Sequence, residues 1–428
     1  MTRTIEVSAL ARVEGEGGLM VQLDGDSITD VQLRIYEPPR FFEGFLRGRH
    51  FAEVPDLTAR ICGICPVAYQ MTSVLALERA LGVEVSPQID GLRRLFYCAE
   101  YIESHALHMF MLQAPDLTGH ESALTLAQDA PDLVRSALRL KRIGNEILTV
   151  VGGRSVHPVN ACVGGFYSWP DPDRLRALLA DLEWGLQASV ESIRWAATLP
   201  YPEFDVDYEW VALHAGDHYA VMDGEIRSSV HGGLPIGEYE NQYVEVQVPH
   251  STALHSETRL GGVYQVGPLA RFNVNFEQLR PEARRIADEV GLAPPLRNPY
   301  RALLARGLEL IQAFADSIDL IGSYTPEGPS RADFEVRAGQ GAAATEAPRG
   351  LLFHRYQIDD DGLVQQARIV PPTAQNLGRI EADLRQLIPG LLACPDDEIQ
   401  MDCEALIRAY DPCISCSTHF LTLKLDRG

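Results

Sequence analysis

Two short stretches, ARICGICP at residues 59–66 and DPCISCSTH at residues 411–419, decide how this sequence folds. Each contains a CxxC pair, and the pairs lie near opposite ends of the 428-residue chain. Four thiolates suit zinc, an iron-sulfur cluster or another soft transition metal, because sulfur donors match such ions. A metal bound by both pairs would tie the front of the chain to its end, so we expect the site at the centre of the fold.

Two simpler interpretations of the cysteine pairs remain open from the residues alone. The first is a structural zinc held by four cysteines, although such sites commonly draw their ligands from neighbouring segments. The second is a redox dithiol of the thioredoxin type, which needs only one CxxC pair beside a βαβ unit. The wide separation of the pairs favours neither.

The composition indicates a folded globular protein with no affinity for polyanions. Hydrophobic residues make up 46% and charged residues 22% of the chain, close to average globular usage. Thirty-seven basic residues face 59 acidic ones, and the net charge of −22 repels phosphate backbones and anionic lipid. We therefore exclude nucleic acid as a partner.

The sequence gives no sign of a membrane span or a secretion signal. No segment has the roughly 18 nearly uninterrupted apolar residues that a membrane helix needs. The first residues, MTRTIEVSALARVEG, lack a basic patch followed by an apolar core. Eight cysteines are too few for a disulfide scaffold in a chain of this length. We expect a cytoplasmic protein.

The spacing of apolar residues predicts a predominantly helical fold of the α+β class in a single large domain, residues 1–428. Alternation around Gly25-Asp26 indicates a β-hairpin, and Pro131 and Gly153 bracket an expected long helix. A second helix is expected from Pro172 to near Pro200. The expected parts are a hairpin region (1–45), a core bundle of long helices (65–200), a β-rich insertion (201–275) and a helical, metal-binding C-terminal part (276–419).

A glycine motif at Gly339-Gln340-Gly341, continuing to Ala344, fits G-x-G-x-x-A after a strand-like DFEVRA stretch (333–338). Pro348 follows four residues later, so no helix can open there to present its N-terminus to a pyrophosphate. We reject dinucleotide binding by this chain.

The residues around the two cysteine pairs resemble the signature motifs of the nickel-iron hydrogenase large subunit. Six further stretches occur in the order that this family shows: ARVEGEGG (11–18), RFFEGFLRGR (40–49), ESHALHMFMLQAPD (103–116), GGRSVHPVNACVGG (152–165), TEAPRG (345–350) and PPTAQN (371–376). The resemblance covers essentially the whole chain. Chain length, the CISC spelling and the short C-terminal tail look most like the cytoplasmic, NAD(P)-linked bidirectional hydrogenases and sulfhydrogenases.

The resemblance implies a nickel-iron centre that cleaves molecular hydrogen. Cys62 and Cys413 would be terminal nickel ligands, while Cys65 and Cys416 would bridge nickel to an iron that carries cyanide and carbon monoxide. Thiolates suit nickel because soft donors stabilise its higher oxidation states, and a terminal thiolate can accept a proton.

Further site residues follow from the same resemblance. Arg349 matches an arginine poised over nickel and bonded to one cyanide, and Asp116 and Asp411 match acidic residues that hold it. Pro372 and Thr373 match the pocket for the other cyanide.

Two further roles concern a proton and a second metal. Glu14 matches the glutamate that takes a proton from the thiolate of Cys413, whereas neighbouring Glu16 is expected to be solvated. Glu43 and His419 match ligands of a Mg²⁺ ion near the C-terminus.

The chain departs from the family pattern at Tyr69, where a histidine is common. Tyrosine can donate a hydrogen bond but cannot carry a positive charge, so tuning of the site is expected to differ. We expect His105, His108 and His157 to be core or hydrogen-bonded residues, because thiolates already complete the metal site.

The resemblance also implies partners. The other cysteines are scattered, so electrons must leave through an iron-sulfur small subunit, and then through a flavin-containing, iron-sulfur diaphorase to NAD(P). Residues 420–428 match a tail that a maturation endopeptidase removes after His419. The alternatives are a noncatalytic quinone-site or scaffold subunit of a complex-I-like assembly, whose relatives have lost the thiolates, and the structural zinc protein.

Overall fold

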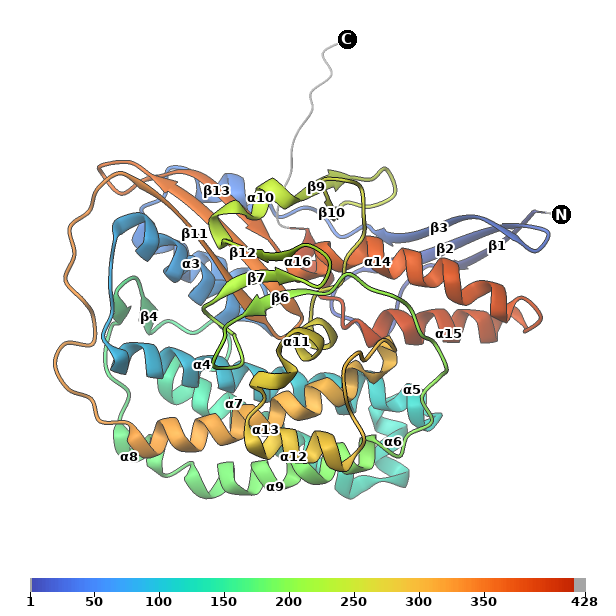
Figure 1. Ribbon diagram of the computed structural model, residues 1–428, viewed down its shortest axis with the longest axis horizontal. Helices are drawn as coiled ribbons and strands as arrows, with labels where there is room; N and C mark the ends of the chain where they lie inside the picture. Colours follow the sequence, from blue (N-terminus) through green and yellow to red (C-terminus); the bar gives the residue numbers. More distant parts are fainter. Residues whose placement is uncertain (1, 419–428) are drawn as a thin grey trace, which may run out of the picture.

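Long helices form the base of the molecule, as the computed structural model of the chain shows for residues 2–418, the part that it describes. These helices are α4 (Pro87–Leu107), α7 (Pro131–Gly152), α9 (Leu179–Ala196), α12 (Pro281–Glu289) and α13 (Ala302–Ser323). Helix α4 packs against α7 and α13, and α13 packs against α9 (Figure 1). The expected helical bundle is confirmed.

Close packing of these helices depends on two glycines. A Cβ on Gly144 of α7 would lie 2.7 Å from the carbonyl oxygen of Ala99 in α4, and one on Gly185 of α9 would lie 2.2 Å from the Phe314 ring of α13. Contacts this short are not tolerated, so larger residues would force these pairs of helices apart.

A layer of small antiparallel sheets lies above the helices (Figure 1). Strands β11 (Gly339–Ala347), β12 (Gly350–Ile358) and β13 (Val364–Val370) form one sheet, against which helix α3 (Pro66–Leu81) packs. The β-rich insertion contributes two more sheets: β6 (Val211–His214), β7 (Glu225–Ser228) and β8 (Gly232–Leu234) in one, and β9 (Tyr243–Gln247) and β10 (Leu254–Thr258) in the other.

The N-terminal region forms a three-stranded sheet rather than a simple hairpin. Strands β2 (Gly17–Asp24) and β3 (Ser27–Ile35) turn at Gly25-Asp26 as expected, and β1 (Thr2–Val7) adds to the free edge of β2. Apolar residues of the sheet pack on helices α14 (Pro372–Leu387) and α15 (Asp396–Ala409) in a second core.

The remaining elements are short. They are α1 (Phe42–Leu46), α2 (Val54–Thr58), α5 (Ala114–Thr118), α6 (Ala123–Asp129), α8 (Pro172–Arg176), α10 (Tyr239–Gln242), α11 (Pro268–Asn275), α16 (Ile414–Ser417), β4 (Ala161–Cys162), β5 (Gly165–Phe166), a π-helical turn (His108–Gln113) and six 3₁₀ turns, at Phe51–Glu53, Ala59–Ile61, Ile236–Glu238, Phe276–Gln278, Pro299–Arg301 and Ile388–Leu391. No helix among the described residues is long and apolar enough to cross a membrane.

Apart from β1, the expected elements differ from the structure in two places. The helix expected from Pro172 is two helices, α8 and α9, and residues 333–338 form no strand. The strand begins at Gly339, so the glycine motif lies inside β11. The tight turn that ends β11 leads into strand β12 rather than into a helix. The rejection of a dinucleotide-binding turn is therefore confirmed.

Candidate metal centre

The two cysteine pairs converge from opposite ends of the chain. Cys62 follows a short 3₁₀ turn, Cys65 caps helix α3, and Cys413 and Cys416 flank the start of α16. The Sγ atoms of Cys62 and Cys413 are 3.5 Å apart, and those of Cys65 and Cys416 are 3.8 Å apart. All four sulfur atoms lie within 4.8 Å of one another and are buried. The two pairs therefore lie together and could hold one metal centre.

Two charged side chains, those of Glu100 and Arg40, hold the backbones of the two cysteine motifs. The Glu100 carboxylate of α4 accepts hydrogen bonds from the first turn of α3, at Val67 N (2.6 Å) and Ala68 N (3.1 Å). Arg40 donates from one guanidinium nitrogen to the carbonyl oxygens of Ile61 and Ser415, which belong to the two different motifs. Sequence analysis missed this role of Arg40, although the residue opens one of the stretches that carry the resemblance.

Burial affects the thiols themselves. It raises the pKa values of Cys413 and Cys416, and hydrogen bonds from Cys413 and its neighbours lower the pKa of Cys62. Thiols that burial keeps protonated become thiolates when a soft metal ion binds them. The site is therefore suited to a metal rather than to a free dithiolate.

Glu14 lies directly beside the site. Its backbone forms a parallel bridge with Cys413, and its carbonyl oxygen accepts a hydrogen bond from Ile414 N at 2.9 Å. The Cys413 thiol donates to Glu14 Oε2 at 3.0 Å, and Ser415 N donates to the same oxygen at 3.0 Å. The predicted contact between this carboxylate and this thiol is present.

Arg349 and Asp411 form a buried ion pair next to the thiols. Arg349 donates from Nε to the Asp411 carbonyl oxygen (2.9 Å) and from Nη2 to its Oδ1 (3.0 Å). Burial opposes charge on both partners. The Asp411 carboxylate and the Cys413, Cys65 and Cys62 sulfur atoms nevertheless raise the pKa of Arg349, and Arg349 holds the pKa of Asp411 below its usual range. The guanidinium therefore stays charged.

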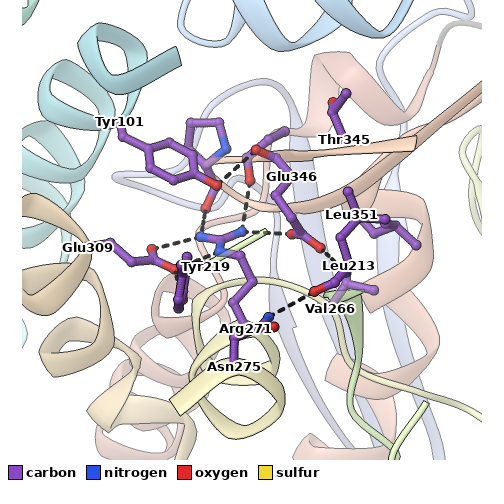
Figure 2. Close-up of polar contacts among 12 residues, drawn as sticks. Tyr101, Leu213, Tyr219, Val266, Arg271, Asn275, Glu309, Thr345, Glu346 and Leu351 are labelled. Carbon is purple, nitrogen blue, oxygen red and sulfur yellow. Dashed lines mark hydrogen bonds and ion pairs between the residues drawn. The ribbon is translucent and has the colours of Figure 1, made fainter. Parts of the chain in front are cut away.

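A second buried arginine fixes the loop that carries Arg349 (Figure 2). The guanidinium of Arg271, in α11, lies between the carboxylates of Glu309 (2.6 and 2.8 Å) and Glu346 (3.1 Å). It also donates to the carbonyl oxygens of Ala347 (2.9 Å) and Pro348 (3.0 Å), the two residues before Arg349. Helix α13 and strand β11 are thus held to α11 through one cation, which positions the β11–β12 turn.

The structure gives Asp116 partners other than Arg349, so its expected role beside that arginine stays a prediction. Its carboxylate pairs with Arg12 and, at 2.8 and 2.9 Å, with Arg408, and it makes no contact with Arg349. Asp116 lies after the π-helical turn that extends α4, which places it beside the loop of Arg12 and helix α15. Among residues 2–418, Asp411 is the acidic residue that pairs with the Arg349 guanidinium.

Other predicted site residues lie near the cysteines or the end of the described chain. Pro372 and Thr373 open helix α14, and the Thr373 hydroxyl accepts a hydrogen bond from Cys413 N at 3.0 Å. Glu43 accepts one from Ile369 N at 2.7 Å. Arg40, which shortly precedes Glu43 in the sequence, donates from its N–H to the Thr418 carbonyl oxygen at 2.7 Å. Thr418 is the residue before His419. His419 itself lies outside the described residues.

The histidines do not join the four sulfur atoms. His105 Nε2 lies 2.8 Å from Glu309, His108 Nε2 lies 2.8 Å from the Arg408 carbonyl oxygen, and His157 Nδ1 lies 2.7 Å from that of Ala59. Tyr69 is buried beside Cys416 and Cys65, and burial together with these sulfur atoms raises the pKa of its phenol. The interpretation of the three histidines as core or hydrogen-bonded residues is confirmed.

The donor set fits a pair of soft metal ions with a further acceptor group. Four buried thiols in one cluster could hold soft metal ions. Arg349 Nη1 is buried and has no hydrogen-bond partner among the described residues, so a donor beside the sulfur atoms is available to a bound group.

Comparison with known sequences gives a consistent result. The sequence profile of the family described as Nickel-dependent hydrogenase matches residues 40–137 and 252–419. The chain is 32% identical to the Sulfhydrogenase 1 subunit alpha of Pyrococcus furiosus over 423 residues, 98% of each chain. It is 27% identical to the NAD-reducing hydrogenase HoxS subunit beta of Cupriavidus necator, covering 98% of this chain and 96% of that one.

Solved structures agree on the fold. The crystal structure of an NAD⁺-reducing NiFe hydrogenase in its H₂-reduced state aligns with a TM-score of 0.87 at 26% identity, covering 97% of this chain and 99% of that one. The Ni-Fe-Se hydrogenase of D. vulgaris Hildenborough aligns at 0.76 and 23% identity, over 98% and 100% of the two chains, which supports the fold alone. The expected resemblance to sulfhydrogenases and NAD-linked hydrogenases is confirmed. This chain belongs to the nickel-dependent hydrogenase family, and its reaction is the cleavage of molecular hydrogen.

Proposed function

We propose that the chain is the catalytic subunit of a hydrogenase whose nickel-iron centre is held by Cys62, Cys65, Cys413 and Cys416. Cys62 and Cys413 would be the terminal ligands of nickel, and Cys65 and Cys416 would bridge it to iron. The iron carries cyanide and carbon monoxide. When bound, this centre polarises hydrogen and accepts its two electrons. The observation that carries the proposal is the convergence of the four buried sulfur atoms within 4.8 Å.

Side chains of this subunit accept and transfer the proton that hydrogen cleavage releases. Cys413 Sγ holds the proton released from hydrogen, and Glu14 Oε2 accepts it across their 3.0 Å contact. Ser415 supports the next step, since its N–H binds Glu14 Oε2 and its hydroxyl donates to Glu37 Oε2 at 2.9 Å. Glu37 is partly exposed, so it is the carboxylate through which the proton leaves toward solvent.

Arg349 supplies a fixed positive charge above the site. Its ion pair with Asp411 orients the guanidinium, and its free Nη1 is the donor for an iron-bound cyanide. Thr373, next to Pro372 and bonded to Cys413 N, lines the pocket for the second cyanide.

The remaining assignments rest on the relatives. Electrons leave through an iron-sulfur small subunit and a flavin-containing diaphorase, with NAD(P) as acceptor, as the names of the NAD-reducing relatives suggest. NAD(P) coupling in turn supports a cytoplasmic assembly. Glu43 and His419 bind Mg²⁺, and a maturation endopeptidase removes residues 420–428.

Infrared spectroscopy of the purified active complex, together with metal analysis, tests this function. We expect cyanide and carbonyl stretching bands, one nickel per large subunit and hydrogen uptake with an artificial dye. Zinc in place of nickel, with no such bands and no hydrogen uptake, would contradict the proposal and favour a structural zinc site. Inactivity with intact thiols but no metal would indicate an immature precursor.

A further inference from the structure

A second cluster of metal-ligating side chains lies apart from the cysteines. His250, His255 and Glu381 each place a ligand atom within 4.8 Å of the others. None of them contributes to the four-sulfur set or to the proposed Mg²⁺ ligands. From this geometry we infer that the three residues bind a divalent transition-metal ion of the Zn²⁺ type, which joins the β9–β10 hairpin to helix α14.

The fold brings the three residues together from two elements. His255 lies on β10, and its Nδ1 is 3.8 Å from the position of a Cβ on Gly378 of α14. Because Glu381 follows Gly378 by three residues, it lies on the same face of the helix. The His255 ring therefore lies beside the face of α14 that carries Glu381.

His250 lies in the loop between β9 and β10, and that loop is fixed. The Ser251 hydroxyl accepts a hydrogen bond from Ala253 N (3.1 Å), and Thr252 donates from its N–H (2.8 Å) and hydroxyl (3.0 Å) to the Ile35 carbonyl oxygen. The loop is therefore held at the end of β3. A fixed loop lowers the entropic cost of bringing His250 to a metal.

His255 supplies an independent reason to expect a ligand. Its side chain is only 3% exposed, and within residues 2–418 its Nε2 has no hydrogen-bond partner. An unsatisfied buried polar atom costs about 1–3 kcal/mol, so such atoms are rare without a function.

The other two ligands already lie close together. His250 Nε2 is 2.8 Å from Glu381 Oε1, an oxygen that also accepts a hydrogen bond from Leu33 N at 2.8 Å. Ligand atoms of a tetrahedral zinc ion are about 3.3 Å apart, given metal-ligand bonds near 2.0–2.2 Å. A small rotation of the partly exposed His250 ring would therefore lengthen the distance from His250 Nε2 to Glu381 Oε1 enough to admit an ion. The same rotation would bring the His250 ring nearer to His255.

The donor set selects the class of metal. Two imidazoles and one carboxylate suit Zn²⁺ and similar ions, with water in the fourth position, whereas Mg²⁺ and Ca²⁺ require mostly oxygen ligands. The ion would link β10, α14 and, through the Leu33–Glu381 hydrogen bond, β3. We expect it to stabilise this corner of the molecule rather than to take part in hydrogen cleavage.

Metal binding to the chelator-treated, purified hydrogenase complex tests the site, with Co²⁺ as a spectroscopic probe. The wild-type complex should take up Co²⁺ with visible d–d bands of a four-coordinate ion and without the near-ultraviolet thiolate-to-cobalt band that the cysteine site would give. His250→Ala and His255→Gln should each weaken binding by about tenfold or more. His231→Ala, at an exposed histidine of the same insertion, is the matched control and should bind normally.

Zinc should also raise the melting temperature of the wild type and of the control, but not of the two variants. Because His250 is partly exposed, its variant decides the result if His255→Gln fails to fold. Absence of Co²⁺ uptake by the wild type, or equal binding by the His250→Ala and wild-type complexes, would overturn the inference. Nickel content and hydrogen uptake report on the cysteine site separately.

Discussion

At the residue scale, the proposed proton path begins at the contact between Cys413 and Glu14. The thiol lies 3.0 Å from a carboxylate oxygen that a backbone N–H also holds, so the acceptor is fixed before any proton moves. Proton transfer by a positioned group typically contributes a factor of about 10²–10⁴ to rate.

Replacing Glu14 by Gln should therefore slow hydrogen–deuterium exchange by about 100-fold or more. Glutamine preserves shape and can still accept from Ser415 N, but it cannot take up the proton. Infrared bands and nickel content should not change, because no metal ligand is altered. Glu16→Gln is the matched control, since Glu16 is exposed, and its exchange rate should equal that of the wild type. Equal rates in Glu14→Gln and wild type would exclude Glu14 from the proton path.

His108 gives the chain a predictable response to acid. Burial, reinforced by the charge of Arg306, lowers its pKa from 6.5 to about 3, against the opposing effect of Asp411. Below pH 6.5 the unfolded chain binds a proton here that the folded chain does not. The free energy of unfolding should therefore fall as the pH drops from about 6.5 toward 3.

His108→Gln should make this decline shallower by up to about 1.4 kcal/mol per pH unit, which corresponds to one proton. Denaturant unfolding of the metal-free chain at several pH values measures the slope. The variant is less stable at neutral pH because the hydrogen bond to the Arg408 carbonyl is altered, so the slope and not the absolute stability is diagnostic. Parallel pH profiles would contradict the assignment.

At the scale of elements, the Arg271 network holds α11, α13 and β11 together. Arg271→Met would leave the carboxylates of Glu309 and Glu346 buried without their cation, and removing one partner of such a network costs about 3–5 kcal/mol. We expect that loss in chemical denaturation of the metal-free chain. Arg280→Met, which removes a partly exposed cation from Asp316 and Asp319, should cost about 1 kcal/mol or less. Similar losses in both variants would show that the buried network has no special role.

The elements themselves were largely predictable from local signals. Pro131 and Gly153 bracket α7 because proline favours the first helical turn and glycine the left-handed residue after the last one. Strand β1 was missed, since its alternation is short and its partner strand could be identified only in three dimensions.

The position of a site residue could be predicted where a single sequence motif indicates its role. It could not be predicted where the residue pairs with charged residues from distant segments. The cysteines, Glu14, Arg349 and Asp411 meet as their motifs suggested. Asp116 does not join them, because its partners Arg12 and Arg408 come from segments that no local pattern connects to it. The His250, His255 and Glu381 cluster had no sequence signature, since its histidines are five residues apart and its glutamate lies on a distant helix.

At the scale of the whole molecule, the proposed removal of residues 420–428 concerns the segment that follows the C-terminal cysteine motif. Thr418, the last described residue, is already bound to Arg40. We expect the active enzyme to end at His419, as the resemblance of residues 420–428 to the family's removed tail implies. Mass spectrometry of the large subunit measures this directly. An intact Gly428 in fully active, nickel-loaded enzyme would contradict processing, whereas an intact tail on metal-free material would agree with it.

The central claim is that sulfur atoms from both ends of the chain hold one nickel ion. X-ray absorption at the nickel edge of the purified complex tests it most directly. We predict a first shell of sulfur scatterers with an iron atom beyond it, and loss of that shell together with the nickel in Cys413→Ser. A first shell of nitrogen and oxygen, or nickel that remains bound in Cys413→Ser with an unchanged spectrum, would contradict the account.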